Sequence, residues 1–228
     1  MNNRFKGILL DIDNTVYDYN KTHSLAKDSL VNFCLKEFKI TSEDVNFAYN
    51  KARNLVHIEL SETAASHNRL LYIQKMLEIL NINPTIYGLD IYNAYWDCFL
   101  KSLKPFKGVE ILLDKYKHSI CLVTDLTAHI QYRKIKKLGL DNFCDKLVTS
   151  EEAGREKPHP YMFMLALKKL GLRVNDVCMI GDNFKKDIFG ATSLGIESIW
   201  FNHEDKPQNY NDKLITEVNN FNKILELL

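Results

Sequence analysis

The stretch Gly7-Ile8-Leu9-Leu10-Asp11-Ile12-Asp13-Asn14-Thr15 decides how the rest of the chain is interpreted. A short apolar run is followed at once by two carboxylates, and such a run is typical of a buried strand in a parallel sheet. Open sheets of this kind bind their ligands at the carboxyl ends of the strands. The stretch therefore predicts an α/β fold with a polar site that begins at Asp11.

Four further apolar runs have the same character. They are Ile120–Val123, Leu147–Val148, Val177–Ile180 and Ser198–Phe201. Segments of helical character separate the later runs, and this alternation is expected of a doubly wound parallel sheet with helices on both faces. We expect residues 1–17 and 104–228 to form this α/β core. The tail, Lys213–Leu228, has the pattern of a final amphipathic helix.

Residues 18–103 break the alternation of strands and helices. Their apolar side chains repeat at helical spacing, as in the aromatic stripe Tyr92–Phe99, and strand signals are absent. The pair Asn83-Pro84 marks a helix boundary. We expect about four helices here, inserted into the core after its first strand, with the aromatic stripe in their interior.

Composition excludes several classes of protein. Of the 228 residues, 46% are hydrophobic and 26% are charged, which is typical of a folded globular protein. The net charge of +1 provides no strong field to attract nucleic acid or an anionic membrane. The five cysteines form no CxxC pair, and neither a signal-peptide core nor a membrane-length apolar run is present. We expect a cytoplasmic protein without disulfides.

Polar residues follow the other apolar runs as well. Thr124 follows the second run, Asp182 and Asp187 follow the fourth, and Lys157 stands just ahead of a predicted helix that starts near Tyr161. If the runs are parallel strands, these side chains meet at one edge of the sheet.

Carboxylates gathered at one edge repel each other unless a cation neutralises them, and clustered oxygen ligands suit Mg²⁺. Such a cation keeps positions open for a phosphate oxygen, while a lysine and a hydroxyl hold the remaining phosphate oxygens. The set therefore predicts a phosphoryl-transfer site with bound Mg²⁺.

Four motifs in order make the sequence resemble the haloacid dehalogenase superfamily. They are Asp11-x-Asp13-x-Thr15, Thr124, Lys157-Pro158 and Gly181-Asp182-Asn183-x-x-x-Asp187. The resemblance implies a Rossmann-like core with a small helical cap of the C1 type, here residues 18–103. The form of the first motif and the size of the cap are similar to the nucleotidase and acylneuraminate-phosphatase branches. Two positions depart from the family pattern, because Asp125 replaces the common Asn or Gly and His159 replaces the common Asp.

The resemblance also implies roles for the acidic residues. Asp11 would be the nucleophile that forms an aspartyl-phosphate, and Asp13 the general acid and base. Asp11, Asp182 and the backbone carbonyl of Asp13 would hold Mg²⁺. Asp187 would be a further ligand or would orient the site or Lys157. The alternatives are a metal ligand or a strand-end cap for Asp11, a loop carboxylate for Asp13, a helix cap for Asp182 and a solvated helix charge for Asp187.

Four core residues would bind the phosphoryl group itself. Thr124 and Lys157 would hold its oxygens, and Lys157 would also offset charge in the transition state. The backbone amides of Asn14 and Thr15 would assist, and Asn14 tolerates the left-handed conformation that such a turn can require. A strand-end hydroxyl and a surface lysine are the alternatives for Thr124 and Lys157.

Four polar residues of the cap are candidates for substrate binding. They are Arg53, His57, His67 and Arg69. A solvated helix face is the alternative explanation for all four.

Together these features predict a Mg²⁺-dependent phosphatase for a small soluble phosphomonoester, namely a sugar phosphate, a sugar-acid phosphate or a nucleoside monophosphate. The expected partner is a small phosphorylated metabolite rather than a nucleic acid or a membrane. The presence of Asp13 disfavours a dehalogenase, and nothing in the cap marks a phosphomutase. A phospho-accepting signalling protein uses similar residues, but it needs neither Asp13 nor a long helical insert.

Overall fold

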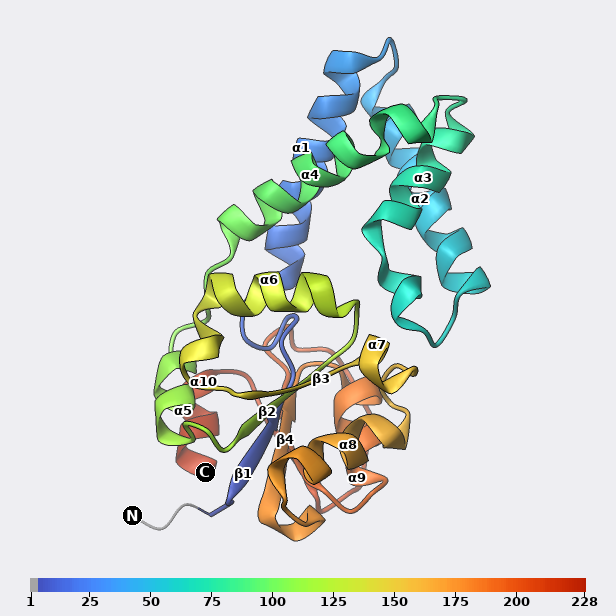
Figure 1. The fold of residues 1–228 in the computed structure, drawn as a ribbon. Helices are drawn as coiled ribbons and strands as arrows, with labels where there is room; N and C mark the ends of the chain where they lie inside the picture. Colours follow the sequence, from blue (N-terminus) through green and yellow to red (C-terminus); the bar gives the residue numbers. More distant parts are fainter. Residues whose placement is uncertain (1–3) are drawn as a thin grey trace. The chain divides into compact units, whose positions relative to one another are not determined.

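The computed structural model describes residues 4–228, and the chain divides into two compact units (Figure 1). The core unit runs to Asp18 and resumes at Lys104, and the helical unit is Tyr19–Leu103. Among the described residues, no helix combines the length and the apolar character needed to span a bilayer. All five cysteines are free thiols.

Six parallel strands, counted over residues 4–228, form the sheet of the core unit in the order β3-β2-β1-β4-β5-β6. They are β1 (Gly7–Leu10), β2 (Ile120–Thr124), β3 (Lys146–Thr149), β4 (Val177–Gly181), β5 (Glu197–Phe201) and β6 (Ile215–Val218). The five predicted strands are confirmed. The chain winds away from β1 in both directions, so the first motif lies at the switch point where doubly wound sheets bind ligands.

Successive side chains of the strands point to opposite faces of the sheet, and both faces are covered. On one face, Leu9, Val123 and Met179 pack in a fully buried cluster with Met162 and Phe163 of α8 (Pro160–Leu170). On the other side of the sheet, α5 (Val109–Lys115) and α10 (Phe221–Leu227) lie side by side (Figure 1). Coverage of both faces explains why the strands are continuous apolar runs.

The remaining elements of the core unit are short. They are α6 (Ala128–Leu138), η2 (Leu140–Asn142), α7 (Ser150–Ala153), η3 (Val174–Asp176), η4 (Phe184–Phe189) and α9 (Gly190–Thr192). The helix predicted near Tyr161 is α8, which begins with Pro160 at its first position. The His159 side chain caps it by accepting a hydrogen bond from the Tyr161 amide at 3.2 Å.

The prediction of one helix over Lys213–Leu228 is wrong in its first half. Residues Ile215–Val218 form β6, which pairs with β5, and the Ser198 amide donates to the Leu214 carbonyl at 2.8 Å. Ile-Thr-Glu-Val is rich in β-branched residues, which suit a strand, and the open side of β5 supplies its partner. A new helix starts only after Asn220, whose side chain caps α10.

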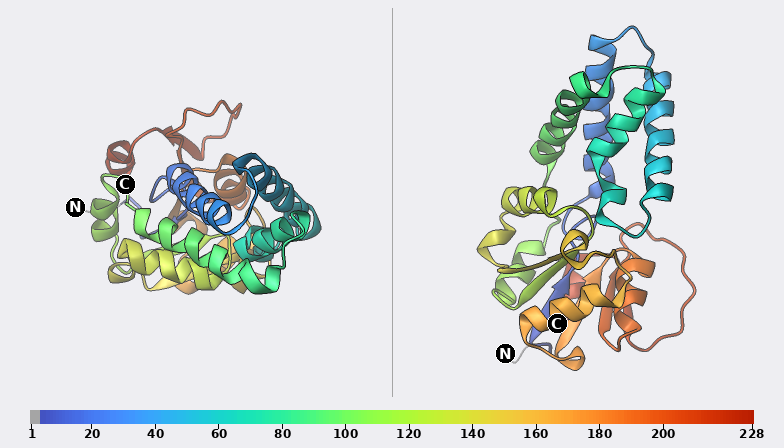
Figure 2. Two further views of the ribbon diagram at one scale, coloured as in Figure 1. Left: turned by 90° about the horizontal axis from the view of Figure 1, so that it is seen from above. Right: turned by 45° about the vertical axis from the view of Figure 1, so that its right-hand side comes forward.

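The helical unit consists of α1 (Tyr19–Glu37), α2 (Ser42–Glu59), η1 (Ala64–His67), α3 (Arg69–Ile79) and α4 (Pro84–Ser102). The four predicted helices are confirmed. Helix α1 packs along α4, and α2 packs along α3 (Figure 2). Asn83 caps α4 and Pro84 begins it, while Tyr95, Trp96 and Phe99 are buried as predicted for the aromatic stripe.

Candidate active site

Asp11 directly follows the central strand, and a lysine from a distant part of the chain contacts it. Lys157 Nζ donates to Asp11 Oδ1 at 2.6 Å and to the Val123 carbonyl at 2.9 Å. The same nitrogen lies 2.6 Å from Asp187 Oδ1. One buried ammonium therefore bridges two buried carboxylates. Its own pKa is well above the usual range, because Asp11 and Asp187 outweigh the effect of burial.

Asp11, Asp182 and Asp187 form an acidic cluster, in which one carboxylate oxygen of each lies within 4.8 Å of the others. Burial raises the pKa of Asp11 to about 7 despite the attraction of Lys157. Burial and the charge of Asp11 raise the pKa of Asp182 to about 6, and burial also raises that of Asp187. These carboxylates therefore resist ionisation together when no cation is present.

The acidic cluster fits a hard divalent cation. Asp11 is 4% exposed, and its Oδ2 atom is buried without a hydrogen-bond partner. Buried carboxylate oxygens are rarely left unsatisfied, and oxygen ligands this close together suit an ion such as Mg²⁺. The burial of Asp187 excludes the alternative that it is a solvated helix charge.

Backbone geometry near the first and fourth motifs positions the acidic cluster. Asn14 has φ of 65°, the left-handed conformation predicted as possible for it, and its Nδ2 donates to Asp182 Oδ2 at 2.9 Å. The Asn183 amide donates to Asp187 Oδ2 at 3.0 Å. A Cβ atom on Gly181 would lie 2.5 Å from the Asp187 side chain. Only glycine at this position therefore allows Asp187 to turn back over the end of β4.

Asp13 has a different environment from the acidic cluster. Lys134 Nζ donates to both of its carboxylate oxygens, at 2.7 and 2.8 Å, and Gln131 Nε2 donates to Oδ2 at 3.2 Å. The Tyr17 hydroxyl donates to Oδ1. Burial tends to raise the pKa of Asp13, but Lys134 and the hydrogen bonds outweigh it and leave the pKa below the usual range.

Sequence patterns do not single out Tyr17, Gln131 or Lys134. Lys134 is only 1% exposed although it lies on a helix with many charged residues. Gln131 and Lys134 stand three positions apart, so they share one face of α6 with the buried Ile130 and Ile135. The position of Gln131 and Lys134 on an otherwise apolar helix face was the sequence signal that could have identified them. Polar side chains on such a face need buried hydrogen-bond partners.

Thr124 and Thr15 complete the polar edge of the central strands. Thr124 ends β2, and its hydroxyl accepts a hydrogen bond from Gln131 Nε2 at 2.8 Å. The Thr15 hydroxyl is buried without a hydrogen-bond partner. The structure therefore brings together, at the carboxyl ends of β1, β2 and β4, all eight core residues that the motifs predict. They are Asp11, Asp13, Asn14, Thr15, Thr124, Lys157, Asp182 and Asp187.

Asp125, which departs from the family pattern, contacts the backbone of Lys157 and the side chain of Lys186. Its Oδ1 accepts a hydrogen bond from the Lys157 amide at 3.0 Å, and its Oδ2 lies 2.7 Å from Lys186 Nζ. Lys186 also contacts Glu156 at 3.0 Å. Asp125 thus fixes the backbone from which Lys157 reaches Asp11.

A family model described as haloacid dehalogenase-like hydrolase matches residues 8–201, a span that contains the whole helical unit, most of the core unit and all four motifs. The chain belongs to this family. Among the curated relatives of this haloacid dehalogenase-like hydrolase is a ribulose-1,5-bisphosphate 5-phosphatase of Halopiger xanaduensis. It is 32% identical over 87% of this chain and 85% of the relative. A glyceraldehyde 3-phosphate phosphatase of Pyrococcus furiosus is 27% identical over 98% of this chain and 94% of the relative.

A solved structure supports the fold of the haloacid dehalogenase-like hydrolase. A HAD phosphatase from Thermococcus onnurineus superposes with a TM-score of 0.74 at 18% identity, covering 97% of this chain and 96% of that one. The resemblance drawn from the four motifs is confirmed, as is the parallel-sheet core with inserted helices.

The four cap candidates of this haloacid dehalogenase-like hydrolase all lie in the helical unit. Arg53 is exposed on α2, and His57 Nε2 lies 2.9 Å from the Tyr72 hydroxyl. The rings of His57 and His67 are 5.0 Å apart. Arg69 is 7% exposed, so a solvated helix face does not explain it.

Proposed function

We propose that the protein is a Mg²⁺-dependent phosphatase that hydrolyses a small phosphomonoester through an aspartyl-phosphate on Asp11. One observation carries the proposal: the buried nucleophile candidate lies in an acidic cluster and contacts a buried lysine at 2.6 Å. The acidic cluster supplies ligands for the cation, and the lysine supplies a fixed positive charge for the phosphoryl oxygens. A family of hydrolases that contains named sugar-phosphate phosphatases supports the same chemistry.

The first step transfers the phosphoryl group to the protein. Asp11 attacks phosphorus with one carboxylate oxygen, the P–O bond to the leaving group breaks, and Asp13 gives that oxygen a proton. Thr124 and Lys157 hold the oxygens of the transferred group. Asp11, Asp182 and the Asp13 carbonyl would hold Mg²⁺, which would supply positive charge to neutralise the phosphoryl group.

The second step returns Asp11 to its starting state. Asp13 takes a proton from water, the water oxygen bonds to phosphorus, and the acyl-phosphate P–O bond breaks to release inorganic phosphate. Asp13 is ionised at this point because it gave its proton to the leaving group in the first step, and Lys134, which lowers its pKa, favours this ionised form. Asp187 holds Lys157 in place and adds negative charge next to the cation.

The substrate class we favour is a sugar phosphate. The two relatives described above are named for ribulose-1,5-bisphosphate and glyceraldehyde 3-phosphate, both phosphate esters of small sugars. Sugar-acid phosphates and nucleoside monophosphates remain the alternatives. We assign residues 18–103 as the cap that selects among them and residues 1–17 with 104–228 as the catalytic core.

The first prediction is that Asp11→Asn abolishes turnover without unfolding the protein. The amide keeps the shape of the side chain but is not a competent nucleophile, so kcat for a sugar phosphate falls by about three orders of magnitude or more. We expect acid-quenched wild-type protein to carry the phosphoryl group on the peptide that contains Asp11, and mass spectrometry of the digested protein measures this.

The matched control is Asp141→Asn, an exposed aspartate that pairs with Lys136 on the surface. This variant keeps wild-type activity. Phosphate on another residue refutes the assignment of Asp11, and a phosphoprotein that persists for many minutes indicates a signalling switch instead of a phosphatase.

A further inference from the structure

The helical unit contains a buried arginine without a carboxylate partner. Arg69 Nη1 donates to the His67 carbonyl at 2.9 Å, Nε donates to the Tyr95 hydroxyl at 3.4 Å, and Nη2 donates to the Tyr19 hydroxyl. Among the described residues, none of its hydrogen-bond acceptors is charged. Burying a guanidinium with only neutral partners costs free energy, because the lost hydration is not fully replaced.

Other cations of the helical unit gather around Arg69. They are Lys27 of α1 and Arg53 of α2. Together with Arg69 of α3 and the neutral His23 whose pKa these charges affect, they make the set that we call the cationic cluster: His23, Lys27, Arg53 and Arg69. Burial lowers the pKa of His23 to about 3, and the charged neighbours that lower it further are Arg69, Lys27 and Arg53. The imidazole is therefore neutral, and the charges that it faces are all positive.

Aromatic rings hold the cationic cluster together. The His23 ring stacks on Tyr19 with centroids 5.6 Å apart, and His23 Nδ1 lies 2.7 Å from the Tyr95 hydroxyl. The Arg69 guanidinium lies 5.7 Å from the centroid of the Tyr95 ring. The Arg69 guanidinium is thus fixed in position by contacts that do not cancel its charge.

A second observation points to a ligand at the cationic cluster. The Tyr49 hydroxyl is buried without a hydrogen-bond partner, and the residue is 1% exposed. Lys27 Nζ lies 5.4 Å from the centre of the Tyr49 ring, and the charges of Arg69 and Arg53 both act on this hydroxyl. A free donor beside several cations is the complement of an oxyanion.

We propose that the cationic cluster is an anion-binding site of the helical unit that takes a carboxylate or phosphate group. Arg53 is exposed and Lys27 is half-buried, so an anion from solvent can reach these two cations of the cluster. The anion has two possible sources: a second charged group carried by the substrate, which rests on the function proposed above, or a free anion that binds on its own.

Binding is tested without reference to catalysis. Inorganic phosphate is titrated into the full-length protein without Mg²⁺, and the NMR signals of the His23 ring are followed after assignment with His23→Gln. We expect saturable shifts of these signals, with affinity at least about tenfold weaker in Arg53→Ala, which is about 1.4 kcal/mol. Arg53→Lys retains part of the affinity. Arg53 is exposed, so its replacement leaves the fold intact.

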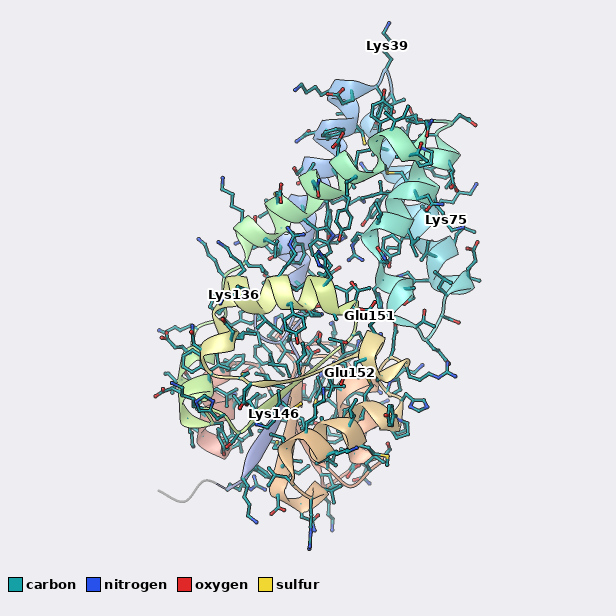
Figure 3. All side chains as sticks on the ribbon, viewed as in Figure 1. Lys39, Lys75, Lys136, Lys146, Glu151 and Glu152 are labelled. Atoms are coloured by element: carbon teal, nitrogen blue, oxygen red, sulfur yellow. The ribbon has the colours of Figure 1, made fainter. Side chains whose placement is uncertain are left out.

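The matched control is Lys39→Ala, which removes a cation at the tip of the same unit, where its side chain points away from the helices (Figure 3). This variant binds phosphate as the wild type does. The proposal is overturned if millimolar phosphate leaves the His23 signals unchanged, or if Arg53→Ala and Lys39→Ala respond equally.

A matched pair of substrates then identifies the source of the anion. Glycerol 3-phosphate and 3-phosphoglycerate differ by one carboxylate, and their kcat/KM values are compared in the wild type and in Arg53→Ala. If the anion belongs to the substrate, the preference for 3-phosphoglycerate falls about tenfold in the variant. If Arg53→Ala leaves the preference for 3-phosphoglycerate unchanged, while the wild type still binds phosphate near His23, the site binds a free anion instead of a substrate group. Absence of hydrolysis of this pair and of a panel of sugar phosphates would contradict the proposed phosphatase while leaving the binding result valid.

Discussion

Asp13 is held in place by Tyr17, Gln131 and Lys134, and Lys134 alone donates to both of its oxygens. An acid and base works best when its pKa lies near the working pH. The ion pair instead keeps the pKa of Asp13 below its usual range. Lys134 therefore determines how much of Asp13 is protonated at a given pH, and we treat it as a positioning residue.

Replacing Lys134 by Met is expected to move one limb of the pH profile. The variant loses the charge and two hydrogen bonds that favour the ionised carboxylate, so the pKa of Asp13 rises. The limb of kcat/KM against pH that Asp13 controls then moves to higher pH by about one unit or more. p-Nitrophenyl phosphate hydrolysis across the pH range measures this shift.

Lys136→Met is the control for Lys134, because Lys136 lies on the same helix and points outward to pair with the exposed Asp141 (Figure 3). Its profile should match that of the wild type. If Lys134→Met lowers activity equally at every pH, the lysine has a structural role only.

At the scale of elements, the turn from β4 into η4 depends on close packing at Gly181. We expect Gly181→Ala to push Asp187 out of the acidic cluster, since the new Cβ would lie 2.5 Å from its side chain. The strain lowers the unfolding free energy by about 1–3 kcal/mol. The displacement of Asp187 also lowers kcat. Denaturant unfolding measures the loss of stability, and steady-state kinetics measures the loss of activity.

Gly88→Ala is the matched control for Gly181→Ala, because we expect it to raise the stability of the protein instead of lowering it. Gly88 lies inside α4, and a Cβ at this position has no atom within 4 Å. Alanine is a better helix former than glycine by about 1 kcal/mol, so this variant should be more stable than the wild type. Equal effects of the two substitutions would show that crowding at Gly181 is unimportant.

The elements and motifs of the core were predictable because they depend on local pattern. Apolar runs give buried strands, and Asp11 and Asp182 directly follow two of them. The tail was not predictable, since Ile215–Val218 becomes a strand only when β5 presents an open side to it. The contacts of Lys134 and Asp125 likewise depend on partners more than thirty residues away, which periodicity within one segment does not reveal.

At the scale of the whole molecule, the acidic cluster couples stability to pH and to metal. The folded pKa values of Asp11, about 7, and Asp182, about 6, lie above the ordinary value of 3.8. Between pH 4 and 7 the folded state therefore holds more protons than the unfolded state. The contribution of these two groups to the free energy of unfolding consequently falls as the pH rises. A bound cation removes this penalty.

We expect Mg²⁺ to stabilise the wild type at pH 7, by about 2.7 kcal/mol when its concentration is a hundred times the dissociation constant. Mg²⁺ should stabilise the Asp182→Asn variant less than it stabilises the wild type. Without metal, however, it should be more stable than the wild type at pH 7, because one repelling carboxylate is gone. Thermal unfolding with Mg²⁺ and with chelator measures both differences. Equal Mg²⁺ responses in the two proteins would argue against a cation at Asp182.

The position of the helical unit within the chain bears on how the protein is made. β1 emerges from the ribosome before the other strands of the sheet, yet its neighbours begin at Ile120 and Val177. All of Tyr19–Leu103 is synthesised before either neighbour exists. Contacts that are local in sequence form fastest, and N-terminal parts fold first during translation. The helical unit can thus be complete while β1 is still an unpaired apolar strand, which leaves Ile8–Leu10 dependent on chaperones or on rapid elongation until β2 arrives.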